Sequence, residues 1–199
     1  FGHFLLTELL LNILKKSAPS RMGIVSSVVH SGNEKNRHKV HLDDLNWNTR
    51  EFSNMNAYSE AKVANILYAM ELATRLEGTG VTTASIHPGW ARSNFGRNMG
   101  GLGMRLMMGL MRVVMTILFP LNWYMTDSNE QSAQTSLHVL LSDDAPKHSG
   151  AYFSQHSVLY RDREYRKGGW PMRSPNPNAR DMEKAKKLVD LTYELVGLK

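Results

Sequence analysis

Three segments of this chain alternate in the order expected of a parallel β-sheet. Short apolar runs over residues 22–26 and 81–86 predict strands buried on both faces, and residues 57–76 between them carry apolar side chains at helical spacing. The helix ends at Gly78-Thr-Gly80, and the second strand ends at the sharp turn His87-Pro-Gly-Trp90. This order indicates a βαβ unit and therefore an α/β fold.

Further elements extend this unit in both directions. Residues 128–142 and 180–195 predict helices, and residues 150–154 predict a last short strand. Residues 1–16 predict an amphipathic helix, with Glu8 and Asn12 off its apolar face. That face is formed by Leu5, Leu6, Leu9, Leu10, Ile13 and Leu14.

The first helix has no capping residue and no initiator Met before it. We therefore expect the chain to begin inside a domain. Residues 1–199 would form the C-terminal part of a single domain, with residues 155–199 as a tail and final helix. No internal repeat or second domain is visible in the sequence.

Composition excludes several kinds of site. The chain has no cysteine, which rules out disulfides, a thiolate zinc site and a Cys nucleophile. Its net charge of +6 fits either an anionic partner or a solvated basic surface. Basic residues do not alternate with stacking aromatics, so we expect no nucleic-acid partner.

Ser27, Tyr58 and Lys62 form a candidate catalytic triad. Tyr58 and Lys62 lie four residues apart on the predicted helix and therefore share one face, which Ser27 can reach from the end of the preceding strand. Tyrosine has a reference pKa of about 10, which a neighbouring ammonium lowers. Such a group can exchange a proton with a substrate oxygen, but a redox reaction also needs a nicotinamide.

A Tyr-x-x-x-Lys pair alone is a weak signal, since Tyr58 can be an ordinary helix residue and Lys62 a solvated one. The pair gains weight from the ordered set of motifs around it. These motifs are Gly2-His-Phe-Leu-Leu-Thr7, Ile24-Val-Ser-Ser27, Tyr58-Ser-Glu-Ala-Lys62, Gly80-Val-Thr-Thr83 and His87-Pro-Gly89. From residue 1 to about 154, the chain resembles the short-chain dehydrogenase/reductase family, in its retinol dehydrogenase and WW-domain oxidoreductase branch.

The resemblance implies a doubly wound parallel sheet of the Rossmann type and a role for each motif residue. Tyr58 would be the catalytic acid/base, and Lys62 would lower its pKa and bind the nicotinamide ribose. Ser27 would orient the carbonyl. The resemblance further implies cofactor contacts at Pro88, Gly89 and Ser93, the last standing where the family usually has a Thr.

The family's Gly-rich turn, its Asn-Asn-Ala-Gly segment and its catalytic Asn would all fall before residue 1. The chain would thus hold about the later half of a Rossmann domain, without the N-terminal nucleotide-binding half. By itself it would bind dinucleotide poorly. The cofactor implied is NADP or NAD, with NADP favoured by the resemblance.

The Met-rich segment 102–125 fits two uses. It can be a flexible lid over an apolar pocket, or an interfacial helix that touches a membrane. Both favour an apolar substrate such as a retinoid, a steroid or a fatty aldehyde. The resemblance also implies an intracellular protein associated with the endoplasmic reticulum or another membrane, and a homodimer that pairs through the helix of Tyr58 and the helix before it.

The polar segment 28–56 is long for a loop, and such loops are often functional. Its His30, His38 and His41 match no compact metal site, so we expect no metal. A basic cluster in the tail can meet a lipid headgroup or simply be solvated, and Trp170 would anchor the tail. The cluster comprises Arg161, Arg163, Arg166 and Lys167.

Two functions follow from these patterns. The first is an NAD(P)-dependent oxidoreductase that interconverts an apolar alcohol and its carbonyl, with a place in lipid metabolism. The alternative is a non-catalytic protein of the same fold that serves as an interaction or assembly subunit, since uncovered helix faces and sheet edges would need a partner.

Overall fold

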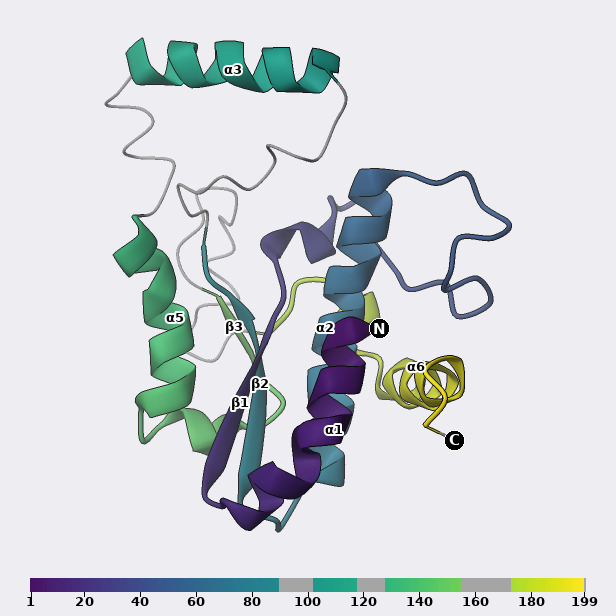
Figure 1. Cartoon of the computed structure of the whole chain (residues 1–199), viewed down its shortest axis with the longest axis vertical. Coiled ribbons are helices and arrows are strands. Elements are labelled where there is room, and N and C mark those ends of the chain that lie inside the picture. Colours follow the sequence, from purple (N-terminus) through teal and green to yellow (C-terminus); the bar gives the residue numbers. More distant parts are fainter. Residues whose placement is uncertain (90–101, 118–127, 155–172, 199) are drawn as a thin grey trace.

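The computed structural model describes residues 1–89, 102–117, 128–154 and 173–198 (Figure 1). Its centre is a parallel sheet in the order β1-β2-β3. The strands are β1 (Ser20–Val25), β2 (Val81–His87) and β3 (Tyr152–Ser154). The predicted βαβ unit is confirmed, because β1 and β2 run parallel, from Ser20 opposite Val81 to Val25 opposite Ile86.

Helices cover both faces of this sheet, which confirms the predicted α/β class (Figure 1). On one face lie α1 (Gly2–Lys16) and α2 (Asn54–Arg75), with α6 (Met182–Leu195) packed against α2. On the other face lies α5 (Asn129–Leu141), whose Val139 packs with Ile86 and Phe153. The Met-rich segment contains α3 (Leu102–Ile117), which stands apart from the sheet in Figure 1.

Helix α2 begins three residues before the predicted position. Ser53 is its N-cap, and the Ser53 hydroxyl accepts a hydrogen bond from the Asn56 N–H at 3.5 Å. Val63, Ile66 and Leu67 recur at helical spacing and are fully buried, in one core cluster with Tyr152 of β3 and with Leu188 of α6. The cap and this apolar face set both the start and the orientation of the helix that carries Tyr58 and Lys62.

Helix α1 is present as predicted, but most of its predicted apolar face does not face the core. Phe4 and Leu11 are the buried residues of this helix. Leu6, Leu9, Leu10 and Ile13 are instead 40–63% exposed. The spacing of apolar residues predicted the helix, but the face that it assigned to the core was largely wrong, because tertiary contacts decide which face turns inward.

Glu8 explains why α1 turns this way. Its carboxylate accepts hydrogen bonds from Tyr68 Oη at 2.8 Å and from two guanidinium nitrogens of Arg75 at 2.8 and 2.9 Å. Tyr193 of α6 donates a further bond to the same carboxylate. Burial opposes ionisation of Glu8, but these donors outweigh it and lower the pKa of the carboxyl group. The acid therefore ties α1, α2 and α6 together.

The two longer strands differ in burial. Strand β2 is buried on both faces at every residue except Thr82, as predicted. Strand β1 was expected to be buried likewise, but Ile24 is its one buried residue and Val25 is 47% exposed. The reason is that β1 pairs with β2 alone among the described strands. Within the described part of the chain, no helix is long and apolar enough to span a bilayer.

Short 3-10 helices complete the described fold. They are η1 (Val28–Ser31), η2 (Ala145–His148) and η4 (Pro177–Arg180). The first follows β1 and packs against α2, and the last packs against α2 from the C-terminal segment. Ser93, Trp170 and the basic cluster of the tail lie outside the described residues.

Candidate active site at the carboxyl end of the sheet

The end of β1 presents two serines in different environments. Ser26 is 2% exposed, and its hydroxyl donates a hydrogen bond to the backbone oxygen of Lys62 at 2.7 Å. Ser27 is half-buried and caps η1, where its hydroxyl oxygen accepts from the Val29 N–H at 3.5 Å. Ser26 thus ties the strand to the helix turn of Lys62, while Ser27 keeps part of its side chain at the surface.

Tyr58 and Lys62 lie one turn apart in the first half of α2. The Lys62 ammonium lies 5.3 Å from the centre of the Tyr58 ring and donates to the Val25 backbone oxygen at 3.2 Å. Asn65, on the next turn, donates to the same oxygen at 2.9 Å. Partial burial lowers the pKa of Lys62. The lysine is therefore fixed beside the tyrosine and close to the last residue of β1.

Pro88 and Gly89 follow directly after β2 at the same edge. The Ser26 N–H donates to the Ile86 oxygen at 2.6 Å, which holds the ends of β1 and β2 together. Gly89 has a φ of 96°, a region that favours glycine. In open α/β sheets, ligands bind outside the carboxyl ends of the strands, which is where these segments converge.

His87 is a buried group of this edge that the sequence did not single out as functional. Its side chain is 4% exposed, and neither ring nitrogen has a hydrogen-bond partner among the described residues. Burial, together with the nearby His30, lowers the pKa of His87 to about 4. A neutral imidazole with an unused donor and acceptor therefore lies next to Pro88.

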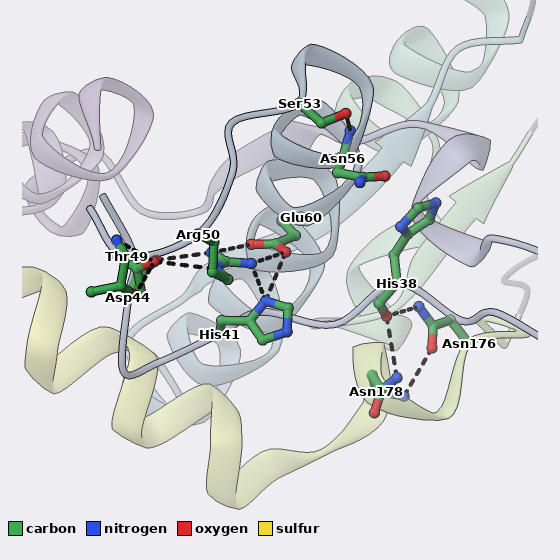
Figure 2. Close-up of polar contacts among 10 residues, drawn as sticks. All are labelled: His38, His41, Asp44, Thr49, Arg50, Ser53, Asn56, Glu60, Asn176 and Asn178. Atoms are coloured by element: carbon green, nitrogen blue, oxygen red, sulfur yellow. Dashed lines mark hydrogen bonds and ion pairs between the residues drawn. The ribbon is translucent and has the colours of Figure 1, made fainter. Parts of the chain in front are cut away.

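The polar loop after η1 is held to α2 by Arg50 (Figure 2). Arg50 donates to Glu60 Oε1 at 2.7 Å, to Asp44 Oδ2 at 3.2 Å and to the Asp44 backbone oxygen at 2.9 Å. Its guanidinium also stacks 4.0 Å from the centre of the Trp47 ring. Because Glu60 lies between Tyr58 and Lys62 in sequence, this network anchors the loop to the helix turn of the candidate site.

Asp44 is the acidic centre of the loop. Burial disfavours its charged form, but hydrogen bonds from Asn48, Thr49 and Arg50 outweigh this and lower its pKa to about 2. His41 Nδ1 lies 2.9 Å from Glu60 Oε1 (Figure 2). These histidine and acidic side chains therefore stabilise the loop through hydrogen bonds and ion pairs. Within the described ranges, no group of three potential metal ligands occurs.

The C-terminal segment reaches the other end of this loop. Asn176 is fully buried, and its side-chain nitrogen donates to the backbone oxygens of His30 and His38, each at 2.7 Å. Asn178 donates to the same His38 oxygen at 3.2 Å (Figure 2). The loop that leads from Ser27 to Tyr58 is thus clamped by α2 on one side and by residues 173–180 on the other.

The structure therefore gathers Ser27, Tyr58, Lys62 and the Pro88-Gly89 turn at one edge of the sheet. The roles implied for these residues remain predictions. Sequence reasoning missed Arg50 and Asn176 as supports of this edge. Arg50 is a charged residue inside a polar loop, and such a position does not indicate which residue it will contact. Asn176 could not be linked to the loop because it lies 146 residues from His30 in sequence.

Comparison with known proteins finds relatives that are similar to this chain over nearly its whole length. Retinol dehydrogenase 13 of Homo sapiens is 37% identical over 99% of this chain and 52% of its own length. Retinol dehydrogenase 14 of Homo sapiens is 35% identical over 99% of this chain and 50% of its own length. The chain thus spans about half the length of these relatives. No model of a protein family matches it.

A solved structure supports the fold. An uncharacterised protein from Mycobacterium paratuberculosis superposes with a TM-score of 0.62 and 25% sequence identity. The match covers 98% of this chain and 55% of that chain. The parallel sheet with helices on both faces is therefore an arrangement that an experimental structure also contains.

Proposed function

The chain is a relative of the retinol dehydrogenases, as its motifs predicted, and from this relationship we propose that it forms part of an oxidoreductase. The reaction is the interconversion of an apolar alcohol, of the retinoid, steroid or fatty type, and its carbonyl. The activity belongs to the whole protein, since the chain spans 52% of the first relative.

Tyr58 is the proposed acid/base. The observation that carries this role is that the Lys62 ammonium lies 5.3 Å from the centre of the Tyr58 ring, one helix turn further along α2, at the edge of the sheet where Ser27 also lies. During carbonyl reduction the Tyr58 hydroxyl gives its proton to the substrate oxygen. During alcohol oxidation the phenolate takes that proton back.

Ser27 is proposed to hold the same oxygen in line by a hydrogen bond. Its half-buried position at the start of η1 supports this role, whereas the Ser26 hydroxyl is occupied by the Lys62 backbone. Lys62 would also bind the ribose of the cofactor.

A nicotinamide cofactor, NADP or NAD, supplies or accepts the hydride when bound, which no side chain of the site can do. The fit of the site is supported by the unpaired, buried ring nitrogens of His87 and by the glycine turn at Gly89. Pro88 and Gly89 are the proposed contacts of the cofactor, together with Ser93.

The apolar substrate class is further supported by α3. Of its described side chains, six large apolar ones are 44–76% exposed. These are Leu106, Met107, Leu110, Val113, Val114 and Ile117. We propose that this face covers an apolar substrate or contacts a membrane surface.

Replacing Tyr58 by Phe in the full-length protein tests the mechanism. Loss of the acid/base should lower kcat about 10²- to 10⁴-fold, with cofactor affinity by fluorescence titration nearly unchanged. Tyr193→Phe is the matched control, because it removes a phenol hydroxyl that bonds Glu8 far from this edge. Undiminished turnover in Tyr58→Phe would contradict the proposed role.

A second candidate is a non-catalytic interaction subunit. It is supported by the outward apolar residues of α1, since Leu6, Leu9 and Ile13 are each at least 60% exposed. Co-purification with a stoichiometric partner and no turnover would favour this function. A monomer that oxidises retinol would contradict it.

A further inference from the structure

The ring of His30 connects the candidate serine to the C-terminal segment. It is fully buried, and its two nitrogens point to different parts of the chain. Nδ1 lies 2.6 Å from the Ser27 backbone oxygen, and Nε2 lies 2.7 Å from the Ser174 hydroxyl. Ser174 is 144 residues away from His30 in sequence.

These contacts determine which nitrogen carries the proton. A carbonyl oxygen can only accept, so Nδ1 must be the N–H donor toward Ser27. Nε2 is then the acceptor of the Ser174 hydroxyl proton. Burial lowers the pKa of His30 to about 4, so the ring is neutral near pH 7 and keeps this one tautomer.

Both ends of this bridge are fixed. The Ser27 oxygen also accepts from the His30 backbone N–H at 3.1 Å, which closes the first turn of η1. At the far end, the Ser174 hydroxyl accepts from the Asn176 N–H at 3.2 Å, and Asn176 holds the His30 backbone oxygen at 2.7 Å. The His30 ring thus links the buried turn at Ser174 and Asn176 to the backbone oxygen of Ser27.

We propose that His30 is a positioning residue for Ser27, whose backbone orientation it fixes through Nδ1 while Ser174 fixes the ring. The proposal rests on the proposed role of Ser27 at the substrate oxygen. A misplacement of about 1 Å at such a group can lower the rate by about 100-fold. His30 itself needs no contact with substrate.

Two conservative variants separate the two ends of the ring. In His30→Asn, the side-chain nitrogen stands at the same number of bonds from the backbone as Nδ1 and can still donate to Ser27. In His30→Gln, the terminal amide stands where Nε2 stood, which keeps the Ser174 contact and loses the donor to Ser27. We expect kcat with retinol within about threefold of wild type for Asn and at least about tenfold lower for Gln, with KM little changed.

A double-mutant cycle with Ser27→Ala tests the coupling. If His30 acts through Ser27, His30→Gln should lower kcat no further once the Ser27 hydroxyl is absent. Equal losses in Asn and Gln, or fully additive losses in the cycle, would overturn the proposal. Turnover that survives Ser27→Ala would instead overturn the proposed role of Ser27, and with it this proposal.

Nitrogen-15 NMR of the unmodified protein keeps the test independent of variant folding. The expected spectrum shows His30 as a neutral ring with the proton on Nδ1. A proton on Nε2, or a charged ring at pH 7, would contradict the bridge. The spectrum does not depend on turnover, so its failure can be told apart from failure of the proposed oxidoreductase function.

Discussion

Mild acid should destabilise this protein through His30 and His87, two buried histidines of the described residues. Burial is the main cause that lowers the pKa of each ring from 6.5 to about 4. In the unfolded chain both rings take up protons near pH 6.5, whereas the folded protein resists this until about pH 4. The contribution of the two neutral rings to stability is therefore fully present well above pH 6.5 and is lost as the pH falls from 6.5 toward 4.

The size of the effect follows from these values. Between pH 7.5 and pH 5, each histidine should lower the free energy of unfolding by about 2 kcal/mol. The pair then removes about 4 kcal/mol, a large part of the 5–15 kcal/mol of a typical domain. Glu8 and Asp44, with their lowered pKa values, lose their contribution at lower pH, so the histidines dominate this window.

Urea unfolding, followed by tryptophan fluorescence at pH 7.5, 6 and 5, measures this dependence. His87→Leu should remove about half of it. At pH 7.5 that variant should be about as stable as wild type, because the unpaired ring nitrogens of His87 are replaced by apolar atoms of similar volume. A free energy of unfolding that is flat from pH 7.5 to 5, or an equal slope in His87→Leu, would refute the reasoning.

Two further perturbations concern the supports of the fold and the loop. Glu8→Gln should lower the free energy of unfolding by about 2–3 kcal/mol at pH 7, because it leaves the half-buried Arg75 guanidinium without its carboxylate; an unchanged urea midpoint would contradict this. Arg50→Lys keeps the charge but loses the planar guanidinium that bonds both Asp44 and Glu60. Backbone amides of residues 41–50 should therefore exchange hydrogen about tenfold faster. The amides of α6 serve as the internal control. Equal exchange in both proteins would show that Arg50 does not hold the loop.

The alternation of strands and helix could be predicted because each element carries its own period. Val63, Ile66 and Leu67 define the inner face of α2 within five residues, and β2 is a nearly continuous buried run. For α1, the helical period is present in the sequence, but the sequence does not show which face of the helix packs on the core. The choice of inner face depends on Glu8 finding Arg75 and Tyr193, which lie 67 and 185 residues further along the chain.

The candidate site shows the same difference between residues that are close in sequence and contacts between distant segments. Ser27, Tyr58 and Lys62 can be proposed from the sequence because the proposed chemistry needs particular residue types at short spacing, within one strand and the helix that follows it. Their supports are not local. His30 meets Ser174 across 144 residues, and nothing in a polar loop or a Pro-rich tail indicates this contact.

The Ser-Tyr-Lys motif alone therefore cannot establish the geometry of the site. A chain can keep a serine, a tyrosine and a lysine at the right spacing and still hold them in the wrong geometry. Here the peptide of Ser27 is held by His30, and His30 by a turn at Ser174 and Asn176 that belongs to the other end of the chain. Orientation at the proposed site is therefore a property of the folded domain, whereas the identity of its residues is a property of one βα unit.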